Sequence, residues 1–186
     1  MNQSYPARTL LGAFMQGSRA PVRRPRIFVS YQHDPDQPYY DLFSRTLHDE
    51  MDLVFDNSLD EEIDSTNTDY VRQAIRDRHI SGTSCTVVLC GPTTYQRKFV
   101  DWEIKATLDK QHGLIGLYLP TAVRGDQGGI IVPSRLHENI QSGFAVWKSW
   151  ETFASNPALM ATWIQEAIGR EKSKIINAKV LKPQNR

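Results

Sequence analysis

The sequence predicts an α/β fold of three layers, in which helices cover both faces of a five-stranded, mostly parallel sheet. From Arg26 onward, short apolar runs alternate with helix-like segments, as in proteins whose parallel strands are joined by helices. Residues 83–90 (TSCTVVLC) are almost all apolar or β-branched, which indicates a central strand buried on both faces. The 186 residues, of which 40% are hydrophobic, suffice for one well-buried domain and not comfortably for two.

The first half of the predicted sheet contains two strands. Residues 26–30 (RIFVS) form the first strand, followed by a polar loop over 31–37 and a helix that begins at Pro38. Residues 52–55 (DLVF) form the second strand. A long acidic loop then leads to a helix that begins near Thr68, whose hydroxyl can cap it.

The second half follows the central strand. Gly91 and Pro92 end that strand, and Thr93 or Thr94 can cap a helix that Gly113 stops. A fourth strand covers 114–119, and a glycine-containing loop with little structure of its own covers 121–134. A fifth, edge strand covers 144–147, and Asn156 with Pro157 starts a last helix. The whole reads as a flavodoxin-like sheet.

Composition excludes several classes of function. The 22 basic and 21 acidic side chains nearly balance, so no overall field attracts nucleic acid or an anionic membrane surface. Cys85 and Cys90 lie in one apolar strand, too far apart to bridge, and we expect reduced core thiols in a cytoplasmic protein. No apolar run has the length of a membrane span.

The domain boundaries follow from the ends of this pattern. We expect a flexible arginine-containing arm over 1–25, one domain over 26–174 and a polar tail over 175–186. An organelle transit peptide shares the Arg-rich, acid-free character of the arm and is the alternative interpretation of it.

Three loops are the places to look for chemistry. In open parallel sheets, ligands bind outside the carboxyl ends of the strands, where the strand order reverses. Segments 31–37, 56–67 and 91–94 follow the first, second and central strands. Polar side chains in these loops are therefore candidates for ligand binding.

Five segments together resemble one known family: FVSY at 28–31, 55–80, VVLCGPTTYQRKFVDWEIKATL at 87–108, HGLIGLYLP at 112–120 and 135–150. They are similar to the TIR-like family typified by the Thoeris anti-phage signalling protein, and the likeness covers roughly 26–170. The resemblance implies a flavodoxin-like TIR fold that cleaves NAD⁺. It also implies a cyclic ADP-ribose-type product that activates a separate effector.

The resemblance also assigns a catalytic residue. TIR enzymes place their glutamate on the third helix in a pattern like aromatic, Cys, any, any, Glu, and Phe99 to Glu103 occupy these places. Val100 stands where cysteine is usual, which leaves the assignment of Glu103 intact. NAD⁺ is then a substrate, and we expect no cofactor and no metal. Without the resemblance, Glu103 would read as a solvated surface carboxylate.

Further candidates for substrate binding lie around the same edge. Tyr31, His33 and Trp102 could stack on the nicotinamide or adenine ring. His33 and Asp34 could reach a ribose or phosphate, or simply form a turn before Pro35. The acidic run 49–69 invites a divalent metal, but lacks the glycine of an EF-hand loop, and such runs are mostly solvated. The predicted substrate-binding residues are Ser30, Tyr31, His33, Asp34, Asp56, Asn57 and Trp102.

Two other functions remain open at this level. A TIR-like domain can be a non-catalytic interaction module that works by self-assembly, and such modules need not keep the glutamate. A flavodoxin-like nucleotide or flavin binder without chemistry is weaker, because no Walker or GxGxxG loop is present.

Overall fold

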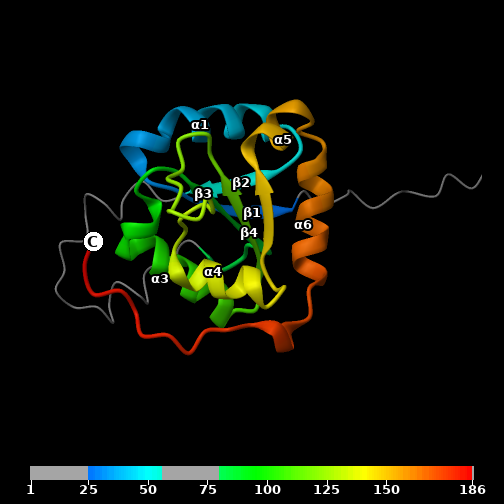
Figure 1. Ribbon diagram of the computed structural model, residues 1–186. Helices are drawn as coiled ribbons and strands as arrows, with labels where there is room; N and C mark the ends of the chain where they lie inside the picture. Colours follow the sequence, from blue (N-terminus) through cyan, green and yellow to red (C-terminus); the bar gives the residue numbers. More distant parts are fainter. Residues whose placement is uncertain (1–24, 56–79, 186) are drawn as a thin grey trace, which may run out of the picture.

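The computed structural model describes residues 25–55 and 80–185. Its core is one five-stranded sheet with the order β2-β1-β3-β4-β5, in which every neighbouring pair is parallel (Figure 1). The predicted α/β flavodoxin-like fold is confirmed, as are a central strand at 85–90 and an edge strand near 146. The strands are β1 (Arg26–Ser30), β2 (Asp52–Phe55), β3 (Cys85–Cys90), β4 (Gly113–Tyr118) and β5 (Val146–Ser149).

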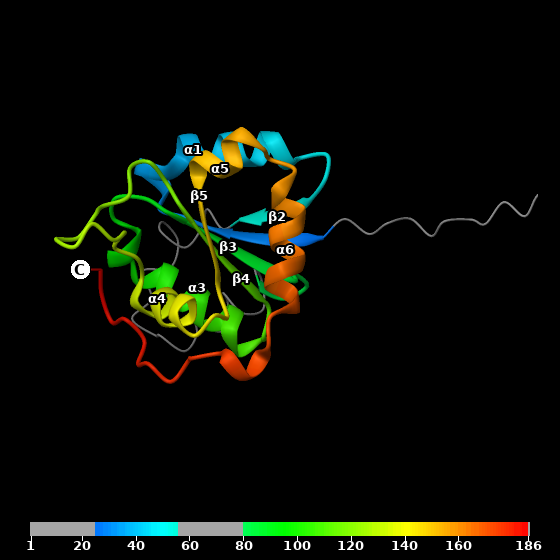
Figure 2. The same cartoon turned by 45° about the vertical axis from the view of Figure 1, so that its right-hand side comes forward.

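Helices cover both faces of the sheet. Figure 2 shows the sheet between two helical layers, with α1, α5 and α6 on one face and α3 and α4 on the other. Within the described residues the helical elements are α1 (His33–Leu47), η2 (Thr94–Gln96), α3 (Lys98–Asp109), α4 (Ser134–Gln141), α5 (Trp150–Ser155), α6 (Leu159–Gly169) and η3 (Lys172–Lys174).

Side-chain alternation along the strands separates the core into two sides. Ile27 and Val29 of β1 belong to the cluster that packs on α1, α5 and α6, whereas Phe28 packs with Trp102 of α3. Since successive side chains of a strand point to opposite faces, Ser30 lies on the same face as Phe28. All six residues of β3 are buried, including the free cysteines Cys85 and Cys90.

The first helix begins earlier than the sequence predicts. α1 starts at His33, not at Pro38, so most of the expected loop over 31–37 is helical. Pro35 lies in the first turn, where a missing N–H breaks no hydrogen bond, and the Asp36 N–H closes that turn on the Gln32 carbonyl. Pro38 lies inside the helix, where one such bond is lost.

The ends of the third helix also differ from the prediction. A short 3₁₀ turn, η2, precedes α3, whose N-cap is Arg97. Thr93 and Thr94 therefore do not cap α3. The helix ends at Asp109, Gln111 takes the left-handed backbone conformation (φ 56°) that the sequence suggests for a glycine, and Gly113 is the first residue of β4.

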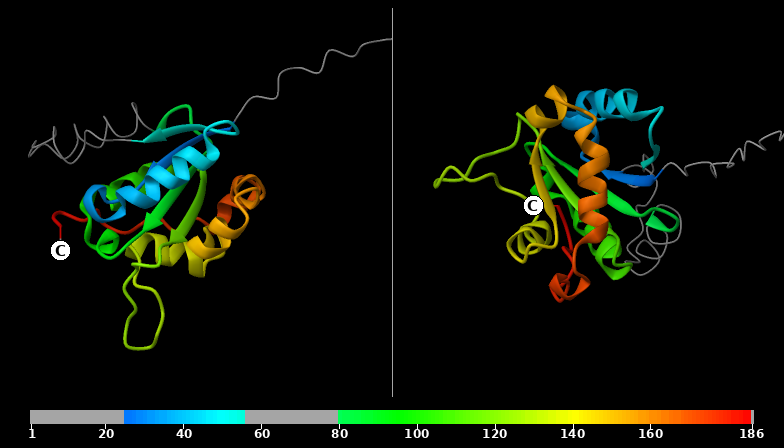
Figure 3. Two further views of the ribbon diagram at one scale, coloured as in Figure 1. Left: turned by 90° about the horizontal axis from the view of Figure 1, so that it is seen from above. Right: turned by 90° about the vertical axis from the view of Figure 1, so that its right-hand side faces the viewer.

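The last third of the domain contains two helices that the sequence pattern did not predict, α4 and α5. The edge strand lies two residues later than 144–147, because the Phe144 and Ala145 amides bond the carbonyl of Asn139 at the end of α4. α6 starts at Leu159, two residues beyond Pro157. The loop before α4 projects from the body (Figure 3) and holds one β-bridge, between Arg124 and Ile130.

The expected helix near Thr68 and most of the N-terminal arm lie outside the described residues. Across 25–55 and 80–185, no helix has the length and apolar character needed to cross a bilayer.

The polar tail packs across α3 and α4. Asn139 of α4 bonds both the N–H and the carbonyl of Ile176, and the Trp102 indole donates to the Lys182 carbonyl at 2.9 Å. In Figure 1 this segment, in red, runs beside both helices. The tail therefore forms part of the layer that carries Glu103.

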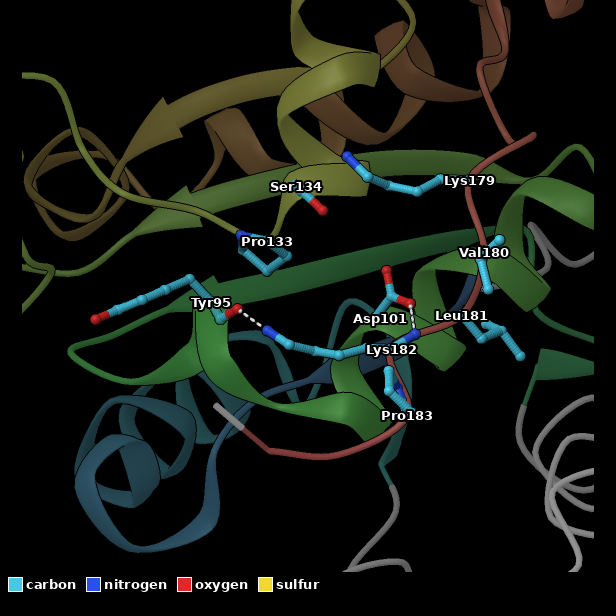
Figure 4. A pocket seen from close by; sticks show the side chains of 9 residues that line it. All are labelled: Tyr95, Asp101, Pro133, Ser134, Lys179, Val180, Leu181, Lys182 and Pro183. Carbon is cyan, nitrogen blue, oxygen red and sulfur yellow. Dashed lines mark hydrogen bonds between the residues drawn. The ribbon is translucent and has the colours of Figure 1, made fainter.

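A buried ion pair lies beneath this tail. The Arg135 side chain is fully buried, and its Nε donates to Asp101 Oδ1 at 3.0 Å. Its other nitrogens donate to Asn177 Oδ1 and to the Lys179 carbonyl, while the Lys182 N–H donates to Asp101 Oδ2. Figure 4 shows Asp101 between the helix and the tail. α3, α4 and the tail are thus joined by one hydrogen-bonded charge network.

Replacing Asp101 by Asn should destabilise the domain by about 3–5 kcal/mol, because the buried Arg135 guanidinium then lacks a compensating charge. Urea denaturation measures the loss. Lys174→Met, which breaks an exposed pair with Glu171, is the matched control and should cost less than about 0.5 kcal/mol. Equal stability of Asp101→Asn and wild type would contradict a structural role for the pair.

Candidate functional site

The strand order places one candidate site at the carboxyl ends of β1 and β3. These strands are neighbours in the sheet, but the chain leaves β1 towards β2 on one side and continues from β3 towards β4 on the other. This is the reversal point at which open α/β sheets bind ligands. The end of β1, the start of α1 and the turn after β3 all meet here.

Two sequence-predicted residues, Ser30 and Glu103, are brought together at this point. Ser30 is the last residue of β1, and its hydroxyl donates to Glu103 Oε2 at 2.5 Å. Glu103 is only 6% exposed, although it lies on a helix whose periodicity alone would suggest a solvated position. The helix is oriented by a second polar contact, between Thr107 of α3 and Thr86 of β3. A carboxylate is thus held at the end of the first strand.

Sequence analysis missed a second carboxylate nearby, that of Asp36. It is fully buried in the first turn of α1, and its Oδ2 accepts the Thr94 hydroxyl at 3.1 Å. Thr94 in turn accepts the Gly91 N–H at 2.8 Å. A Cβ on residue 91 would lie 1.8 Å from Asp36 Oδ1, so only glycine permits this approach. The sequence signal was ambiguous, since acids are common in the first turn of any helix.

Burial raises the pKa of Asp36 from 3.8 to about 6, although hydrogen bonds from Thr94 and Gln32 and the charge of Arg97 oppose the shift. Asp36 Oδ1 is buried without a hydrogen-bond partner, which fits this shift. Because the folded pKa is raised, the contribution of Asp36 to stability is present below pH 3.8 and is lost as the pH rises through 6. The ionised form costs about 3 kcal/mol of folding free energy. Stability therefore does not explain this carboxylate.

Replacing Asp36 by Asn should remove that pH dependence, because the amide has the same shape and does not ionise. Between pH 4 and 7.5 the wild type should lose about 2–3 kcal/mol of unfolding free energy relative to the variant. Denaturant titrations of both proteins at several pH values measure this difference, and all other carboxylates cancel in it. Parallel stability curves would show that the Asp36 pKa is close to that of the unfolded chain.

Tyr31 anchors a stack of rings beside this edge. Its ring lies parallel to that of Tyr40 at 4.5 Å and against His33 at 5.4 Å, and its hydroxyl donates to Gln37 Oε1. Desolvation and the nearby Tyr40 raise the pKa of the Tyr31 phenol, which stays protonated. His33 is partly exposed in this stack, and Asp34 is exposed in the first turn of α1 rather than in a loop.

The remaining predicted site residues are not brought to Glu103 by a described contact. Trp102 is 6% exposed in a cluster with Phe28, Ile80 and Ala106. Its indole N–H donates to the Lys182 carbonyl of the tail. Its stacking on a base stays a prediction. Asp56 and Asn57 lie outside the described residues.

A cationic residue that the sequence analysis did not single out, Arg97, lies between η2 and α3. It is partly buried, and its Nη2 donates to Thr93 Oγ1 at 3.3 Å. Its Nε is enclosed without a hydrogen-bond partner. A lone arginine between a strand and a helix carries no sequence signature, so only the fold reveals its position.

A cavity of about 220 Å³ opens on the other side of α3 (Figure 4). The tail, η2 and the start of α4 line it, and Asp101 at its base is already engaged by Arg135. It is separate from the Ser30 and Glu103 contact, which faces the sheet. Among the described residues, no group of histidine, cysteine or acidic side chains could hold a metal.

A TIR-like domain of flavodoxin-like fold is defined by these features together. They are the all-parallel sheet, its strand order, and the glutamate of α3 that is held at the end of β1. The family model described as "Thoeris protein ThsB, TIR-like domain" matches residues 28–124, and the chain belongs to this family. The matched range runs from the middle of β1 to beyond β4 and includes α3, while α4, β5, α5 and α6 lie beyond it. No curated protein matches the chain.

Proposed function

We propose that this domain cleaves the bond between nicotinamide and ribose in NAD⁺, with Glu103 as the catalytic carboxylate, and releases a cyclic ADP-ribose-type signal for a separate Thoeris effector. The observation that supports this most is the buried hydrogen bond between Ser30 and Glu103, at the edge of the sheet where such folds bind nucleotides. Membership of the Thoeris ThsB family supplies the biological setting.

The chemistry requires only one carboxylate. Ordinary glycosidases use a second one to protonate a poor oxygen leaving group. The nicotinamide ring of NAD⁺ already carries a positive charge, so it departs as a neutral amide without a general acid. A single anion beside the ribose can orient the sugar and stabilise the oxocarbenium-like transition state. Glu103 is enclosed, and low solvent exposure strengthens such an interaction.

Ser30 acts on Glu103 rather than on the substrate in this proposal. Its hydroxyl occupies one carboxylate oxygen, Oε2, and fixes the side-chain rotamer, which leaves the orientation of Oε1 defined. Water attack on the ribose would give linear ADP-ribose, whereas attack by the adenine half gives the cyclic product. A pocket that holds the adenine near the ribose favours cyclisation through effective concentration.

Replacing Glu103 by Gln should lower NAD⁺ turnover by about 10²–10³-fold, because the amide has no charge with which to stabilise the transition state. Chromatography with mass detection measures nicotinamide and both ADP-ribose products, in the presence and absence of lysate from phage-infected cells. Glu171→Gln, at an exposed position beyond α6, is the matched control and should turn over NAD⁺ like the wild type. Equal turnover by Glu103→Gln would exclude it as the catalytic residue.

Replacing Ser30 by Ala should lower kcat by about 10-fold with little change in KM, because the carboxylate remains but its rotamer is no longer fixed. Ser84→Ala is the control, because Ser84 lies just before β3, at the amino ends of the strands. Steady-state kinetics separate the two constants. A rise in KM at unchanged kcat would show that Ser30 contacts the substrate instead.

A further inference from the structure

The guanidinium of Arg97 has hydrogen-bonding capacity that residues 25–55 and 80–185 do not use. Within the described residues it makes one side-chain hydrogen bond, to the neutral hydroxyl of Thr93, and it forms no ion pair. Arginine carries a fork of N–H donors that match the oxygens of a phosphate or carboxylate. A partly buried arginine at a ligand-binding edge, whose Nη1 bonds no described residue, is suited to an anionic ligand.

The turn that bears Arg97 is held firmly in place. Thr94, three residues before Arg97, links the Gly91 amide to the buried Asp36 of α1, and the Arg97 N–H donates to the Thr94 carbonyl at 3.2 Å. The positive charge of Arg97 lowers the pKa of Asp36, yet the two side chains form no ion pair. Asp36 thus holds the turn through Thr94 without forming an ion pair with the guanidinium of Arg97.

The location of Arg97 agrees with a nucleotide ligand. It lies just past the carboxyl end of the central strand β3 and directly before α3, the helix that carries Glu103 six positions later. A dinucleotide extends from its reacting ribose to a diphosphate, which carries the negative charge that an arginine binds in a bidentate manner.

We propose that Arg97 binds the diphosphate of the substrate and that Asp36, through Thr94 and Gly91, is the positioning residue that fixes the Arg97 turn. This assignment rests on the proposed NAD⁺ cleavage for its substrate, but the binding of a ribose-linked diphosphate is measurable without any turnover.

The test compares NAD⁺ with nicotinamide riboside, a substrate that lacks the ADP half and with it both phosphates. For Arg97→Gln, kcat/KM with NAD⁺ should fall about 10- to 100-fold. With nicotinamide riboside, which has the same reacting bond and no phosphate, kcat/KM should stay within about twofold of the wild type. Arg97→Lys, which keeps the charge and loses the fork, should lie between them. Arg45→Gln, at the far end of α1, is the control for removal of one positive charge.

Calorimetric titration with ADP-ribose separates this proposal from the proposed reaction. The wild type should bind ADP-ribose, and Arg97→Gln should bind it at least about 10-fold more weakly, whether or not either protein cleaves NAD⁺. Weaker binding of ADP-ribose by Arg97→Gln, with no NAD⁺ cleavage by either protein, would support the diphosphate site and exclude the proposed NAD⁺ cleavage. An equal loss of kcat/KM for both substrates, or equal affinities of the two proteins for ADP-ribose, would overturn the role of Arg97.

The positioning role has its own readout. Asp36→Ala, which removes the oxygen that accepts the Thr94 hydroxyl, should raise KM for NAD⁺ more than it lowers kcat, since the turn and not the reacting carboxylate is loosened. KM for nicotinamide riboside should stay unchanged. A fall in kcat alone, equal for the two substrates, would overturn the link from Asp36 to the diphosphate.

Discussion

Burial of the central strands on both faces is the constraint on which this structure depends. Helices must cover each side of the sheet, and the period of two along β1 then decides which side chain meets which layer. Ile27 and Val29 pack towards α1, α5 and α6, and the alternate positions face α3. Ser30, the last of those alternate positions, therefore meets Glu103, so the candidate site follows from the packing of the core.

Much of the fold could be predicted because the strands are apolar and continuous. Residues 83–90 predicted the central strand, and the Glu103 assignment rested on a resemblance that the family match supports at the level of the domain. The helix starts were less predictable. Pro38 resembles a first-turn proline, but Pro35 already fills that role, and the hydrogen bonding of Gln32 to Asp36 decides between them.

Other features could not be read from the chain because they arise from contacts between distant segments. The buried face of α4 contains the polar residues Arg135 and Asn139, so the sequence pattern does not predict a helix with a buried face here. Their acceptors lie about 40 residues later, in the tail. Asp36 and Arg97 likewise acquire their environments only when α1 and the turn after β3 come together. A local pattern cannot show which polar residues will be enclosed in this way.

The position of the tail has a consequence for synthesis of the chain. Residues 176–185 provide partners for Arg135, Asn139 and Trp102, and they emerge from the ribosome after everything that they hold together. Until then, Asp101 is the one side chain of the described residues before the tail that bonds the Arg135 guanidinium, and the Trp102 indole lacks its Lys182 acceptor. The sheet can pair earlier from its own strands, so the helical layer that carries Glu103 is the last to reach its final packing during translation.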